Sequence, residues 1–143
     1  RPKSSAASDV YKRQINFILF CQIWIRADKM KIQTLKKRKD FVLSNKFGKK
    51  IFNKNFILQK FTPSDCTILY LKFGFTATKK IGNAVKRNRA KRRMRSLISV
   101  FLKESAFLFD DTSTYILIAK KSLIKAPFYD LKVEMRECLN KLW

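Results

Sequence analysis

The stretch that decides the fold is KKIGNAVKRNRAKRRMRSLISVFL, residues 79–102. Gly82 and Asn83 mark the start of a helix, because Asn is a favoured N-cap residue. From there the apolar residues recur with the helical period and fall within one arc of about 140°. They are Ala90, Met94, Leu97, Ile98, Phe101 and Leu102. The stretch therefore predicts a long helix with one core-facing side.

Segments typical of β-strands lie on both sides of this helix. Residues 49–53, 55–61 and 66–79 are rich in Phe, Ile and alternating apolar residues, which predicts three strands before it. Gly74 interrupts the third and indicates a bulge or a close backbone approach. Residues 113–120, STYILIAK, form an apolar run suited to a strand in the middle of a sheet.

Two more helices complete the pattern. Residues 33–47 place apolar side chains among lysines and stop at Gly48, which predicts a short amphipathic helix. Pro127 is a favourable first residue for a helix that runs to the C-terminus. The order α-β-β-β-α-β-α predicts an α+β fold, an α/β sandwich in which helices pack on a four-stranded mixed sheet.

The first residues differ in composition from the rest. Residues 1–14 are polar, and residues 15–25, INFILFCQIWI, form an apolar run that is shorter than the roughly 20 residues of a membrane span. The run could imitate a signal peptide, but no small-residue cleavage site follows it. Met30 begins a basic segment that is ordinary for the start of a cytosolic domain. We expect residues 1–29 to be a non-native or disordered leader and residues 30–143 to form a single domain.

The charge points to a polyanionic partner. The chain holds 33 Lys or Arg and 10 Asp or Glu, a formal net charge of +23. Such self-repulsion opposes compaction and is typical of proteins that bind polyanions. Because 46% of the residues are hydrophobic and 13 are Phe, the chain is no disordered basic tail. Nucleic acid is the first candidate partner and an anionic membrane surface the second.

The sequence offers few groups for catalysis. Histidine is absent, which removes the commonest general base and metal ligand. Cys21, Cys66 and Cys138 are far apart, so we expect them to be apolar residues in a reducing cytoplasm and predict no zinc site. Asp110 and Asp111 could touch Mg²⁺, but adjacent acids are more typical of a turn. We therefore predict no catalytic residue and no metal site.

Groups that bind anions are abundant on the long helix. Arg87, Lys91 and Arg95 follow an i, i+4, i+8 row about 12 Å long. The N–H groups after Gly82 add a further anion site at the helix start. A solvated basic face and a nuclear-localisation signal are alternatives. No acid lies among these cations to compensate them, however, and the apolar stripe holds them in a fixed array.

These residues carry a family resemblance. The segment GFTATKKIGNAVKRNRAKRRMR, residues 74–95, resembles the signature of the protein subunit of bacterial ribonuclease P, the RNA-based enzyme that trims 5′ leaders from precursor tRNA. The core KKIGNAVKRNRAKR matches almost residue for residue, including the Arg87-Asn88-Arg89 centre. The resemblance extends from about Met30 to Trp143. It implies the element order given above, with a left-handed βαβ crossover through the basic helix.

The resemblance also implies site residues. A cleft between the sheet and the helices would hold the single-stranded leader; Phe41 matches an aromatic residue that lines it, with Phe56 as a second candidate. Core packing is an equally open role for Phe41. Asn45 and Gln59 stand where some members carry further aromatics. The predicted RNA contacts are Lys79, Lys80, Asn83, Arg87, Asn88, Arg89, Lys91, Arg92 and Arg95.

The implied function needs no catalytic group in the chain. RNA-bound Mg²⁺ would cleave the phosphodiester, and the protein, which binds no cofactor itself, would supply positive charge and hold the leader. The expected partners are ribonuclease P RNA and precursor tRNA in the cytoplasm, without membrane or DNA. A ribosomal or other structural RNA-binding protein is the alternative. A DNA-binding module is a weaker alternative because the sequence shows no helix-turn-helix pattern.

Overall fold

The predicted long helix is present and its apolar face is buried. In the computed structural model, which describes residues 33–64 and 71–143, helix α3 spans Ala84–Ser105. The Asn83 side chain caps it by accepting a hydrogen bond from the Lys86 N–H at 3.0 Å. All six residues of the predicted stripe are buried. Predictions for residues 1–29, for Cys21 and for Cys66 lie outside the described residues.

Among the described residues, the sheet has five strands in the order β1-β4-β5-β3-β2. Their bounds are β1 Gln33–Thr34, β2 Lys49–Phe52, β3 Phe56–Phe61, β4 Lys72–Thr76 and β5 Thr114–Ala119. Strand β5 is central, as predicted; it pairs parallel with β4 and antiparallel with β3. The sheet is therefore mixed, and β4, α3 and β5 form a parallel crossover. The left-handed sense of that crossover stays a prediction.

The first predicted helix begins later than expected. Residues Gln33–Thr34 pair parallel with β4 as the added strand β1, and helix α2 spans Arg38–Phe47. A two-residue strand has no periodicity of its own, so only its pairing with a neighbour reveals it. The last helix, α4, spans Phe128–Leu142 after Pro127, as predicted.

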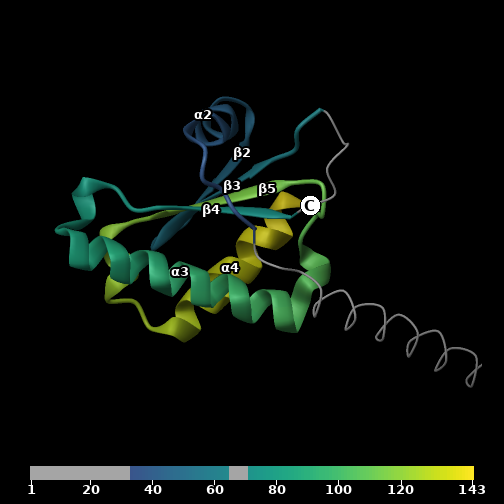
Figure 1. Cartoon of the computed structure of the whole chain (residues 1–143). Helices are drawn as coiled ribbons and strands as arrows, with labels where there is room; N and C mark the ends of the chain where they lie inside the picture. The colour runs from purple at the N-terminus through teal and green to yellow at the C-terminus, as the bar shows by residue number, and fades with distance from the viewer. Residues whose placement is uncertain (1–32, 65–70) are drawn as a thin grey trace, which may run out of the picture. The chain divides into compact units, whose positions relative to one another are not determined.

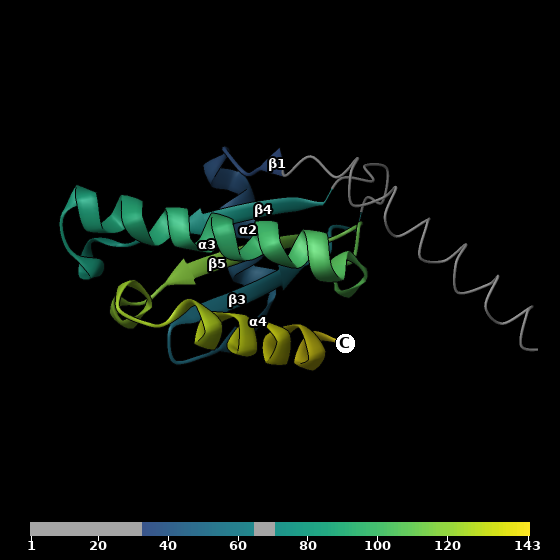
Figure 2. The same ribbon diagram turned by 90° about the horizontal axis from the view of Figure 1, so that it is seen from below.

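The helices cover the sheet unequally. Helices α3 and α4 pack on one face, and α2 alone lies on the other (Figures 1 and 2). On the α3 side, Phe73, Phe109 and Tyr115 form a ring cluster with centroids 5.2–5.9 Å apart. The buried Cys138 lies in α4 as a free cysteine, and burial raises the pKa of its thiol to about 11. Within the described residues, no helix is long and apolar enough to cross a membrane.

Gly74 lets α2 approach the sheet. Strand pairing continues through Gly74, which lies opposite Ile116, so the residue is no bulge. A Cβ atom there would lie 2.8 Å from Cε1 of Phe41, 3.0 Å from Ile116 and 3.1 Å from Leu35. The close approach is thus made by side chains and not by another backbone segment. A larger residue at position 74 would displace the Phe41 ring.

Replacement of Gly74 by alanine should therefore destabilise the domain. The added methyl group overpacks the contact with Phe41 and Ile116, which typically costs about 1–3 kcal/mol. Urea unfolding of Gly74→Ala and of Thr76→Ala, a control on the same strand, measures the difference. An unchanged midpoint for Gly74→Ala would show that α2 adjusts without cost.

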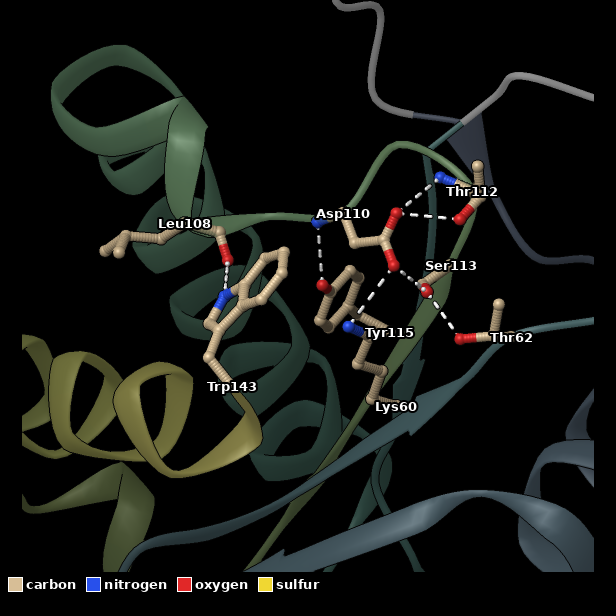
Figure 3. A network of polar contacts seen from close by, with 8 residues as sticks. All are labelled: Lys60, Thr62, Leu108, Asp110, Thr112, Ser113, Tyr115 and Trp143. Carbon is tan, nitrogen blue, oxygen red and sulfur yellow. Dashed lines mark hydrogen bonds and ion pairs between the residues drawn. The ribbon is translucent and has the colours of Figure 1, made fainter.

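The loop before β5 is held by a network around Asp110 (Figure 3). The Asp110 carboxylate accepts hydrogen bonds from the Thr112 N–H at 3.1 Å, the Thr112 hydroxyl at 2.7 Å and the Ser113 hydroxyl at 2.9 Å. Lys60 Nζ lies 3.3 Å from the same carboxylate and 4.6 Å from the ring centre of Trp143. Trp143 in turn donates its indole N–H to the Leu108 carbonyl at 2.9 Å.

These contacts explain the adjacent acids as part of a structured turn. Partial burial alone would raise the pKa of Asp110, but the hydrogen bonds from Thr112 and Ser113 and the contact with Lys60 outweigh it and lower this pKa to about 2. Among the described residues, no group of three or more acidic or cysteine side chains is arranged to hold a metal ion.

The lowered pKa predicts acid sensitivity that depends on Asp110. Because the pKa of Asp110 falls from 3.8 to about 2 on folding, its contribution to stability is complete above pH 3.8 and is lost as the pH falls through 2. We expect Asp110→Asn to lose about 2 kcal/mol at pH 7 and to approach the wild type near pH 2. Denaturant unfolding across this range tests it. Glu104→Gln, which removes the exposed ion pair with Lys132, is the control and should change little.

Candidate nucleic-acid interface

The predicted basic contacts lie along the start of α3 and the 3₁₀ helix before it. That helix spans Lys79–Ile81 and leads through Gly82 and Asn83 into α3. Seven of the nine side chains are exposed, and Arg87 and Lys91 are half-buried at the border of the apolar stripe. The 3₁₀ helix and the first half of α3 thus carry the seven cations and two asparagines of this set, most of them open to solvent.

Gly82 shapes the turn between the two helices. Its φ of 139° lies in a region that residues with a side chain rarely adopt. A Cβ atom there would also lie 2.9 Å from Cδ of Lys86. The turn places Lys79 and Lys80 just before the first turn of α3, where the helix dipole favours an anion.

The charges on this surface lack compensating acids. The first turn of α3 contains no acidic residue, and none of the nine predicted contacts forms an ion pair with another described residue. The Arg95 guanidinium instead lies 5.7 Å from the ring centre of Phe75, a cation–π contact that orients it. The positive charge of this surface therefore favours the binding of an external polyanion.

The predicted leader residues do not share one environment. Phe41 is half-buried on the α2 side of the sheet, where it packs on Gly74. Phe56 is fully buried on the opposite face, with 0% of its surface exposed, so its assignment to a leader cleft is wrong. Gln59 is also buried, at 3% exposure. Asn45 is exposed and accepts a hydrogen bond from Lys50 Nζ at 2.7 Å.

The structure reveals a surface on the α2 side that the sequence reading missed. Four residues pair in register across neighbouring strands and form one row, which we call the cross-strand row: Phe52, Ile57, Ile118 and Thr76. Phe52 is 68% exposed and the other three are half-buried. At about 4.8 Å per strand the row is roughly 14 Å long. It ends at Thr76, three residues before the basic segment begins.

Strand alternation explains both the missed row and the misplaced Phe56. Phe56 and Ile57 are neighbours in β3 and therefore point to opposite faces of the sheet. Sequence alternation separates the two faces but does not say which one the larger helices cover. The one sequence signal for the row was a Phe in the short, lysine-rich segment that forms β2.

Comparisons with known proteins agree with this architecture. The sequence model of the Ribonuclease P family matches residues 30–143. The chain is 31% identical over 111 residues to the ribonuclease P protein component of Nitratiruptor sp., covering 78% of this chain and 93% of that protein. It is 34% identical over 115 residues to the same component of Rickettsia rickettsii, covering 77% and 97%.

Solved structures show the same fold. The chain superposes on the RNase P protein of Staphylococcus aureus with a TM-score of 0.63 and 24% identity, covering 78% of this chain and 96% of that one. For the RNase P protein of Thermotoga maritima the TM-score is 0.61 at 23% identity, with coverage of 76% and 96%. On the family match and on the identity to its relatives, this chain belongs to the ribonuclease P protein family and is the protein subunit of that tRNA-processing enzyme.

Proposed function

We propose that the basic surface of α3 binds the catalytic RNA of ribonuclease P. The observation that carries this proposal is the uncompensated array of nine basic or amide side chains on a helix whose other side is buried. Arginine suits such a surface because its planar fork can bond two phosphate oxygens. A rigid array loses little side-chain and backbone freedom on binding, so more of its electrostatic attraction appears as affinity.

The cross-strand row and Phe41 offer a place for the single-stranded leader of precursor tRNA. Exposed aromatic rings can stack on unpaired bases of any sequence. Phe52 and Phe41 lie on the same side of the sheet, and the row ends beside the basic segment that would meet the phosphates. A strand of RNA could thus follow the row and continue onto Lys79 and Lys80.

The chain itself would contribute binding and not chemistry. The family's enzyme is RNA-based, and we propose that Mg²⁺ ions held by the RNA cleave the phosphodiester in the cytoplasm. The protein would lower the Mg²⁺ concentration needed, because its cations neutralise nearby phosphates. Reconstitution with a bacterial ribonuclease P RNA tests this: without a lower Mg²⁺ requirement for precursor cleavage, the proposal fails.

Loss of one exposed arginine should weaken assembly with the RNA. We expect Arg92→Ala to lower affinity for ribonuclease P RNA and to reduce the slope of log K against log salt by about 1, the change typical of one lost phosphate contact. Filter binding at several salt concentrations measures both. Lys103→Ala, an exposed cation at the far end of α3, is the matched control. Equal effects at both positions would mean that the predicted face has no special role.

Leader binding should depend on Phe52, which belongs to the cross-strand row, and on Phe41 on the same side of the sheet. Phe41→Leu keeps an apolar side chain on Gly74 but removes the stacking ring, and Phe52→Leu does the same at the exposed end. Since stacking contributes about 1–3 kcal/mol per base, each change should weaken precursor tRNA binding by on the order of tenfold. Mature tRNA should bind the holoenzyme as before.

A phenylalanine elsewhere on the same helix provides the control. Phe47 lies in α2, is 71% exposed and takes no part in the contact with Gly74. Phe47→Leu should leave both affinities unchanged. If Phe41→Leu and Phe52→Leu weaken the binding of precursor and mature tRNA equally, the rings do not bind the leader.

A further inference from the structure

One arginine of the basic helix does not extend into solvent. Arg93 is half-buried, and its guanidinium donates to three backbone carbonyls of the segment that joins β5 to α4. Nη1 lies 2.6 Å from the Leu123 oxygen and 2.5 Å from the Ile124 oxygen, and Nη2 donates to the Ala126 oxygen. Arg93 thus connects two elements that lie thirty residues apart in the chain.

The segment that Arg93 holds has a few hydrogen bonds of its own, and the Ser122 hydroxyl also anchors it by donating to the Lys54 carbonyl at 2.9 Å. It contains the 3₁₀ helix Lys121–Ile124, in which the Leu123 N–H donates to the Lys120 carbonyl at 3.1 Å. Two further turn bonds converge on the Ser122 carbonyl, which accepts from the Lys125 N–H at 3.2 Å and the Ala126 N–H at 3.0 Å. Pro127, which follows, has no N–H to offer. A guanidinium presents several donors in one plane and can bond the remaining carbonyls together.

This contact brings more positive charge beside α3. Lys121 and Lys125 are exposed and flank the carbonyls that Arg93 binds. In both ribbon views the segment lies beside the first half of α3 (Figures 1 and 2). Partial burial, and then the nearby charge of Arg89, lower the pKa of Arg93. Arg89 is itself exposed on the predicted RNA-binding face, so the charged surface continues from α3 toward the segment.

Neither lysine forms an ion pair within the described part of the chain. Asp130 and Glu134 line the same groove as Lys125, yet neither forms an ion pair with Lys125 or Lys121. Glu134 instead accepts a hydrogen bond from the Asn55 amide at 2.7 Å. Cations that are not held in ion pairs remain available to a polyanion, which also relieves their mutual repulsion.

We propose that Arg93 is a positioning residue and that Lys121 and Lys125, held beside α3 by it, form a second wall of the RNA-binding surface. The inference rests on the proposed binding of ribonuclease P RNA by α3. In it, phosphates of that RNA contact Arg89 and Arg92 on one side and the two lysines on the other. Arg93 acts through the segment and touches no phosphate.

A double-mutant cycle separates this arrangement from a direct contact. The affinity for ribonuclease P RNA alone is measured against salt for Arg93→Met, for Lys121→Gln with Lys125→Gln, and for all three changes together. The lysine pair should reduce the slope of log K against log salt by about 1 to 2. Arg93→Met should have a similar effect, and the triple variant should bind no more weakly than Arg93→Met.

Control variants make the outcomes distinct. Lys103→Gln with Lys141→Gln removes the same charge from exposed sites elsewhere and should leave the slope unchanged. If the lysine-pair variant binds like this control while Arg92→Ala still weakens binding, the second wall is wrong but the proposed function stands. The same conclusion follows if the effects of Arg93→Met and of the lysine-pair variant on binding are additive. If Arg92→Ala also has no effect, the proposed function fails as well.

Folding of the variants is checked separately. Urea unfolding shows whether Arg93→Met keeps the fold, and amide hydrogen exchange should rise within residues 121–126 and not in β5. Unchanged exchange there would also overturn the positioning role. The lysines are exposed, so the test of the second wall stands even if Arg93→Met does not fold.

Discussion

Burial of the apolar side of α3 against the sheet is the interaction on which the other features depend. Met94, Leu97 and Ile98 have no exposed surface, and each such side chain contributes about 1.5–3 kcal/mol on burial. Repulsion between exposed like charges one helical turn apart costs only about 0.2–0.5 kcal/mol per pair. Burial therefore outweighs repulsion, and the helix can present an uncompensated row of cations in fixed positions.

The two faces of the sheet are covered unequally. The face under α3 and α4 is closed by aromatic and aliphatic side chains. The face under α2 is covered only in part, because Gly74 admits Phe41 close to the backbone while the neighbouring cross-strand row stays open at Phe52. One small residue in β4 thus lets α2 lie close to the sheet at this point.

Much of the fold could be predicted because its signals are local. The cap at Asn83, the stripe of α3, the apolar run of β5 and Pro127 each act within one element, and all four predictions are confirmed. Strand β1 escaped prediction because two residues have no period. Phe56 was placed in the leader cleft wrongly, since the side of a strand that a ligand can reach depends on which helices cover it.

The sequence by itself determined the charge, the periodicity of the long helix and, through the Arg87-Asn88-Arg89 centre, the family. These properties depend on residues that lie close together in the sequence. Only the tertiary structure decided that Phe52 is exposed while Phe56 is buried, and that Arg93 turns inward to three carbonyls while Arg92 faces solvent. The physical reason is that exposure and hydrogen-bond partners come from residues distant in sequence, which strand register and helix packing alone bring together.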